Sequence, residues 1–128
     1  MKKGKITPNG VVLEMHENAT VVFLTEQGYD VELIPPVQLK GARTPDLRMN
    51  GLDWEMKAPT SDGKYTIEHS FRSALRQSPY VIFDICGSKI PQDKVVAEIE
   101  RRFNDFNKAR KLLIITKHKG LLEYEKQN

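Results

Sequence analysis

Apolar residues along this chain recur at helical spacing in some stretches and at strand spacing in others. Helical spacing predicts three helices, at residues 13–27, 66–78 and 91–109. Short runs rich in β-branched or apolar residues predict strands at residues 29–34, 80–85, 112–116 and 121–125, with a further short strand around residues 5–7. This order of helices and strands is typical of an α/β fold with a mixed sheet flanked by helices.

The same spacing predicts which helical side chains are buried. In the second helix the apolar stripe consists of Ile67, Phe71, Ala74 and Leu75. In the third helix it consists of Val95, Val96, Ile99, Phe103 and Phe106. In the first helix we expect the buried side to carry Met15, Ala19, Val22 and Phe23, with Leu24 near its edge.

A β-hairpin is predicted around Asn50-Gly51, because a two-residue type I′ turn needs positive φ at both positions. Counting outward from the turn fixes the register, in which Met49 faces Leu52, Arg48 faces Asp53, Leu47 faces Trp54, and Asp46 faces Glu55. Side chains alternate between the two faces of a strand. One face is therefore apolar (Leu47, Met49, Leu52, Trp54, Met56), and the other is charged (Asp46, Arg48, Asp53, Glu55, Lys57).

The charged face places two carboxylates opposite each other, Asp46 and Glu55, with Cβ atoms about 5 Å apart. Such a pair is unfavourable unless a cation compensates it, and Mg²⁺ takes carboxylate oxygens as ligands. Lys57 points to the same face, where it can reach a phosphate or an attacking water. A second interpretation stays open, in which the hairpin is simply amphipathic and Lys57 relieves the repulsion between solvated charges.

Composition narrows the class of protein. The 128 residues are 39% hydrophobic and 29% charged, so we expect a single globular domain over residues 1–128, with residues 1–12 loosely attached. The net charge of +3 permits a nucleic-acid partner without requiring one. One cysteine, Cys86, excludes an internal disulfide and a cysteine-based zinc cluster. We expect neither a signal peptide nor a membrane span, because the apolar runs are too short.

Pro45-Asp46 followed by Glu55-Met56-Lys57 resembles the PD-(D/E)xK motif of metal-dependent nucleases. The resemblance implies a restriction-endonuclease-like α-β-β-β-α-β core with an added C-terminal helix and strands. It implies a divalent metal ion, Mg²⁺ or Mn²⁺ with Zn²⁺ also open, held by Asp46, Glu55 and the backbone carbonyl of Met56. Lys57 is then the catalytic lysine. The stretch from His16 to Leu24 resembles the first helix of the same superfamily, which implies Glu17 as a further catalytic residue and ligand.

A wider set of residues resembles a narrower family. The chain is similar to the C-terminal tRNA nuclease domains of bacterial contact-dependent growth inhibition toxins at residues 44–46 and 51–59, then at Thr66-Ile67, Ala74, Gln77-Ser78 and residues 81–84. This resemblance implies a toxin that cleaves tRNA in the cytoplasm of a target cell, with a cognate immunity protein and no membrane partner. Such domains normally form the C-terminal parts of very large secreted proteins. They are delivered to the target cell as part of those proteins.

The second helix carries the candidate substrate contacts. His69, Arg72, Ser73 and Arg76 share one flank, on which the three basic residues can contact the phosphate backbone, and Gln77 follows the family's pattern. A solvated helix face is the alternative for each of them. For RNA, a metal-free attack by the 2′-hydroxyl that uses His69 or Arg72 is also open. The alternative functions are a DNA endonuclease and a catalytically silent nucleic-acid-binding domain.

Overall fold

The computed structural model describes residues 2–37, 39, 41 and 44–127. In these residues the chain forms three helices and the seven strands of a mixed sheet, which confirms the predicted α/β class. Contacts divide the chain into two compact units, Met1–Trp54 and Glu55–Asn128. Strand β4 (Leu52–Lys57) carries the backbone from the first unit into the second. That residues 1–128 form a single domain stays a prediction.

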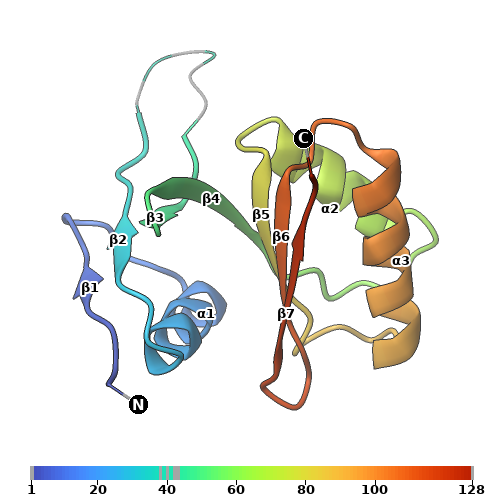
Figure 1. Cartoon of the computed structure of the whole chain (residues 1–128), viewed down its shortest axis with the longest axis horizontal. Coiled ribbons are helices and arrows are strands. Elements are labelled where there is room, and N and C mark those ends of the chain that lie inside the picture. Colours follow the sequence, from blue (N-terminus) through green and yellow to red (C-terminus); the bar gives the residue numbers. More distant parts are fainter. Residues whose placement is uncertain (1, 38, 40, 42–43, 128) are drawn as a thin grey trace. The chain divides into compact units, whose positions relative to one another are not determined.

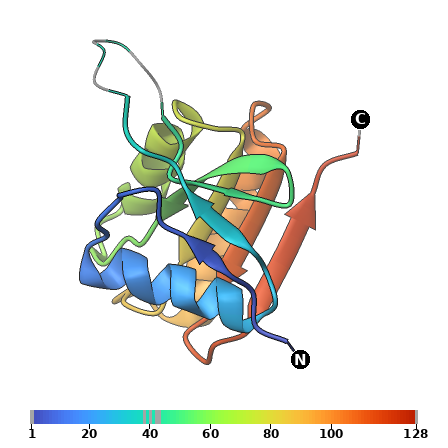
Figure 2. The same ribbon diagram turned by 90° about the vertical axis from the view of Figure 1, so that its left-hand side faces the viewer.

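The first unit contains β1 (Ile6–Thr7), α1 (Met15–Glu26), β2 (Val31–Leu33), β3 (Leu47–Met49) and the first half of β4. Strand β1 pairs in parallel with β2, β2 is antiparallel to β3, and β3 is antiparallel to β4. Figures 1 and 2 both show β1 beside β2. The backbone N–H of Gly4 also donates to the carbonyl of Thr25 at 2.8 Å, so the N-terminal segment is tied to the end of α1.

The hairpin of β3 and β4 has three of the four predicted residue pairs. Leu47 pairs with Trp54, Arg48 with Asp53, and Met49 with Leu52. The two turn residues have positive φ, 55° at Asn50 and 75° at Gly51, as the type I′ turn requires. On the apolar face Trp54 is 4% exposed, and its indole N–H donates to the carbonyl of Met49 at 3.1 Å. On the charged face the Nε of Arg48 donates to Asp53 at 2.8 Å.

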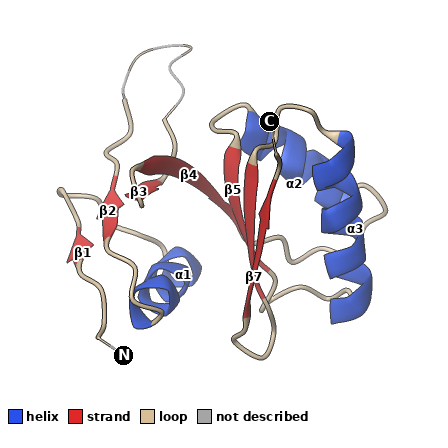
Figure 3. Ribbon diagram, viewed as in Figure 1, coloured by secondary structure: helices blue, strands red, loops and turns tan. Residues whose placement is uncertain are grey.

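The second unit contains the rest of β4, α2 (Thr66–Leu75), β5 (Tyr80–Asp84), α3 (Gln92–Asp105), β6 (Lys111–Ile115) and β7 (Leu121–Glu125). Strand β4 runs parallel to β5, β5 is parallel to β6, and β6 is antiparallel to the edge strand β7. Figure 3 shows α2 and α3 together on one side of β5, β6 and β7. None of the helices in the described residues combines the length and apolarity that a membrane crossing needs.

The core of the second unit follows the predicted stripes of α2 and α3. Seven of the residues expected to be buried are buried: Ile67, Phe71, Ala74, Leu75, Val95, Ile99 and Phe103. The other two, Val96 and Phe106, are partly buried. Helix α3 ends at Asp105, four residues before its predicted end, because Phe106 adopts an extended backbone conformation. The Phe106 ring packs edge-on against Phe71, with the ring centroids 5.6 Å apart.

The predicted buried side of α1 is wrong at three of its four residues. Met15 is 89% exposed, Val22 is 37% exposed, and Ala19 is exposed as well, whereas Phe23 is buried. The buried side consists instead of Thr20, Val21, Phe23, Leu24 and Thr25. Apolar residues lie all around this helix, so its spacing favours no single face. Tertiary packing therefore selected the face that is buried.

Candidate active site

Two residues of the PD-(D/E)xK motif, Glu55 and Lys57, lie together on the part of β4 that belongs to the second unit. Glu55 and Lys57 are two positions apart in a strand and so point to the same face. The Nζ of Lys57 lies 3.7 Å from Oε2 of Glu55, and the two side chains are 26% and 10% exposed. Since a carboxylate is costly to bury without a cation beside it, Lys57 stabilises Glu55 in this position.

A third residue, Ser73 of α2, completes this cluster. The Nζ of Lys57 donates a hydrogen bond to Oγ of Ser73 at 3.2 Å. Ser73 lies on the flank of α2 away from its buried stripe, so the packing of α2 on β5 turns the hydroxyl toward β4. The sequence places Ser73 on the basic flank with Arg72 but assigns it no role, because nothing in a helical serine indicates which strand it contacts. The sequence signal for Ser73 is its position next to Arg72 and one helical turn before Gln77, which are both candidate substrate contacts.

Asp46 lies one residue before β3, in the first unit. Its backbone N–H donates to the carbonyl of Trp54 at 2.9 Å, so Asp46 bonds to the same residue with which Leu47 pairs. The predicted pairing of the Asp46 and Glu55 carboxylates spans the two units and stays a prediction. The same holds for a ligand role of the Met56 carbonyl between Glu55 and Lys57.

Glu17 lies in the first turn of α1, where it has local partners. Its Oε1 accepts a hydrogen bond from the backbone N–H of Glu14 at 3.2 Å, which helps to cap the helix. One potential ligand atom each of Glu14, His16 and Glu17 lie within 4.8 Å of one another. All three residues are at least partly exposed. The contacts of Glu17 in the first unit are thus those of a helix cap, and its role as a ligand beside Glu55 stays a prediction.

The candidate substrate residues of α2 differ in their surroundings. His69 is exposed and stacks on Tyr65, with ring centroids 6.0 Å apart. The Nε of Arg72 donates to Glu68 at 3.2 Å, and its guanidinium lies over the ring of Phe106. Arg76 is exposed near the end of the helix, and Gln77 follows it, half-buried. The basic flank therefore exists as predicted, and Arg72 is its most firmly held member.

Two residues close to the end of β5 have contacts that explain them without catalysis. Oδ1 of Asp84 accepts a hydrogen bond from the backbone N–H of Cys86 at 3.0 Å, which fixes the turn after the strand. Burial, followed by the effect of Asp84, raises the pKa of the Cys86 thiol. A thiol with a raised pKa stays protonated near neutrality and is a poor nucleophile.

The fold and this cluster define an α/β domain with a buried carboxylate, a lysine and a serine where β4 meets α2. A family model for the contact-dependent growth inhibition CdiA C-terminal domain matches residues 43–121, so the chain belongs to that family. The narrower of the two resemblances read from the sequence is thereby confirmed at the level of the family.

A solved structure has a similar fold. It is described as a CdiA-CT/CdiI toxin and immunity complex from Burkholderia pseudomallei, and it matches with a TM-score of 0.64 and 21% sequence identity. The match covers 91% of this chain and 92% of that chain. No curated protein matches the sequence.

Proposed function

We propose that this domain is a metal-dependent nuclease of the PD-(D/E)xK superfamily that cleaves RNA, with tRNA as its substrate. The observation that carries the proposal is the cluster on β4, in which Lys57 lies 3.7 Å from the buried carboxylate of Glu55. A nuclease of this superfamily needs the glutamate and the lysine side by side. Membership in a growth-inhibition family supports the proposal that the domain cleaves a nucleic acid that the target cell needs.

The donor set fits a hard divalent cation. Glu55 offers the oxygens of a buried carboxylate, and its Oε1 is enclosed by protein. Asp46 and Glu17 would add carboxylates and Met56 a carbonyl, all of which are oxygen ligands suited to Mg²⁺ or Mn²⁺. When bound, such an ion lowers the pKa of a coordinated water and polarises the scissile phosphate.

The residues of the chain have separate tasks in this proposal. Glu55 and Asp46 hold the negative charge that attracts the cation. Lys57 donates hydrogen bonds to the attacking water and to the phosphate oxygens, on which charge develops in the transition state. Ser73 accepts a hydrogen bond from Lys57 and so fixes the direction of its ammonium group. The basic flank of α2 contributes contacts to the phosphate backbone.

Cleavage is expected to require a divalent metal. Purified domain should cleave total tRNA in Mg²⁺ or Mn²⁺ and lose this activity in EDTA, because carboxylates alone neither polarise the phosphate nor activate the water. The measurement compares total tRNA, single-stranded RNA and plasmid DNA, each with Mg²⁺, Mn²⁺, Zn²⁺ or EDTA. Gel electrophoresis separates the products.

The result with each substrate and metal condition distinguishes the proposed function from one alternative. RNA cleavage that survives EDTA contradicts the metal mechanism and favours attack by the 2′-hydroxyl. Preferred cleavage of plasmid DNA indicates a DNA endonuclease on this fold. Absence of cleavage with every substrate and metal favours a nucleic-acid-binding domain without catalysis.

Ser73→Ala is expected to lower kcat about tenfold with KM nearly unchanged, since a hydrogen bond to a charged group contributes roughly 1.5–3 kcal/mol. Ser73 is a positioning residue, and Ser73→Thr, which keeps the hydroxyl, should restore most of the rate. Ser70→Ala is the matched control on the same helix. If Ser73→Ala and Ser70→Ala cleave tRNA equally well, Ser73 does not orient Lys57.

The proposal extends to the cell. The similar Burkholderia pseudomallei toxin was solved with its CdiI immunity protein, and we propose that this domain likewise acts in the cytoplasm and is neutralised by a cognate immunity protein. Expression of the domain alone should arrest bacterial growth. Full tolerance of an enzyme that is active in vitro would contradict the role as a toxin.

A further inference from the structure

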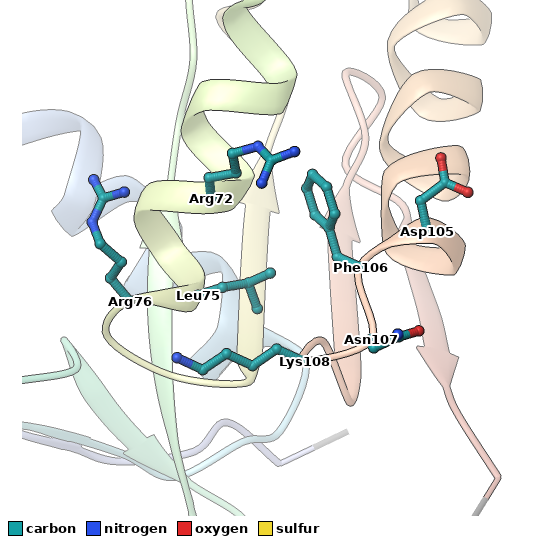
Figure 4. A pocket seen from close by; sticks show the side chains of 7 residues that line it. All are labelled: Arg72, Leu75, Arg76, Asp105, Phe106, Asn107 and Lys108. Atoms are coloured by element: carbon teal, nitrogen blue, oxygen red, sulfur yellow. The ribbon is translucent and has the colours of Figure 1, made fainter.

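The second unit contains a surface cavity of about 420 Å³ at the end of α2. It is lined by Arg72, Leu75 and Arg76 of α2, and by Asp105, Phe106, Asn107 and Lys108 at the end of α3 and beyond it. Figure 4 shows these two groups facing each other, with the side chain of Leu75 extending from α2 toward the other group. Three of the lining residues are cations and one is a carboxylate. Such a lining favours an anionic ligand that also has an apolar or aromatic part.

Arg72 presents a flat and firmly held guanidinium to this cavity. Its Cζ lies 4.7 Å from the centroid of the Phe106 ring, and its Nε donates to Glu68. Figure 4 shows the guanidinium extended toward that ring. Phe106 is fixed in turn by its edge-on contact with Phe71. A guanidinium plane ordered in this way is a stacking surface for a nucleobase, and little side-chain entropy is lost when the base binds.

The other cations of the cavity lie near its opening. Arg76 and Lys108 are both exposed, and in Figure 4 the side chain of Lys108 passes Leu75 in the direction of Arg76. The carboxylate of Asp105 lies on the far side of Phe106. In Figure 4 the guanidinium of Arg76 points away from Lys108, so a phosphate beside the ammonium group of Lys108 would meet that cation at a distance from the one carboxylate. The amide of Asn107 can donate to and accept from a base edge.

We propose that this cavity binds one unpaired nucleotide of the RNA substrate, with its base stacked on Arg72 and its phosphate beside Lys108. The choice of RNA rests on the proposed function. Stacking requires an unpaired base, because a base within a duplex has no free face. Ser73, which contacts Lys57, directly follows Arg72 in α2, so the candidate active site and this cavity use neighbouring residues of the same helix.

The test measures binding without cleavage. All variants are made in the Lys57→Met background, and the probe is a short fluorescent oligouridylate whose anisotropy is followed. Arg72→Lys keeps the charge but removes the flat group, so affinity should fall about tenfold through the loss of stacking. Lys108→Ala should weaken binding and reduce the slope of log affinity against log salt concentration by about 0.7, the value for one phosphate contact on a single strand.

Lys94→Ala is the matched control, because Lys94 is equally exposed at the opposite end of α3. It should leave affinity nearly unchanged. The proposal is overturned if Lys94→Ala weakens binding as much as Lys108→Ala, which would indicate general attraction by surface charge, or if Arg72→Lys binds like its parent. Pocket variants that bind RNA normally but lose an acidic protein partner would assign the cavity to that partner and also overturn it.

Failure of this inference and failure of the proposed function are distinguishable. Cleavage of tRNA with an unchanged KM in the Lys108→Ala chain, made with Lys57 intact, contradicts the nucleotide pocket and leaves the nuclease proposal standing. Specific RNA binding that depends on Arg72 and Lys108, without cleavage in any metal, supports the pocket and contradicts the nuclease proposal.

Discussion

Replacing Lys57 with methionine is expected to lower the rate of tRNA cleavage by about 100-fold or more. Methionine keeps an unbranched apolar stem of similar length but removes the ammonium group that lies 3.7 Å from Glu55 and 3.2 Å from Ser73. Without that group, neither the attacking water nor the developing charge on the phosphate is stabilised by a protein cation. The measurement is single-turnover cleavage of labelled tRNA in Mg²⁺, with thermal unfolding of the variant to show that it is folded.

The matched control for Lys57→Met is Lys111→Met. Lys111 is also a strand lysine beside a glutamate, with its Nζ 3.5 Å from Glu125, and it lies on β6. Its replacement should leave cleavage unchanged, because surface ion pairs contribute little and this one touches no part of the cluster. Glu55→Gln and Asp46→Asn should each lose activity as Lys57→Met does. Full activity in all three folded variants would refute the site.

Replacing Phe71 with alanine is expected to destabilise the domain by about 3–5 kcal/mol. Phe71 is fully buried, and its ring centroid lies 5.1 Å from that of Phe83 and 5.6 Å from that of Phe106. Its removal leaves a cavity between α2 and the sheet and releases the Phe106 ring that lies beneath Arg72. The free energy of unfolding is measured by urea titration, and oligouridylate binding to the variant should fall as well.

Tyr65→Ala provides the comparison for Phe71→Ala. Tyr65 is also aromatic and directly precedes α2, but it is 53% exposed, so its loss should cost about 1 kcal/mol or less. Equal destabilisation by the two substitutions would show that packing on α2 does not hold this unit together.

The accuracy of the sequence predictions differed between elements for physical reasons. The hairpin register was correct because Asn50-Gly51 is a local turn signal and alternation along a strand leaves no freedom once the turn is placed. The stripes of α2 and α3 were correct because their apolar residues lie on one side. The face of α1 was wrong because its apolar residues lie on all sides. The end of α3 was wrong because the periodicity runs on into Phe106, which packs in the core without being helical.

In the candidate site, too, some features follow from the sequence and others only from the tertiary structure. The sequence alone determined that Glu55 and Lys57 share a face of one strand and that the cations of α2 share a flank, because strand and helix geometry follow from spacing. It also carried enough of the family pattern to indicate the growth-inhibition family.

Only the tertiary structure decided that Ser73 accepts a hydrogen bond from Lys57 and that Phe106 lies under Arg72. These contacts join residues 16 and 34 positions apart. The positions of their partners depend on how α2 and the segment after α3 pack against the sheet, and no local rule of spacing contains that information.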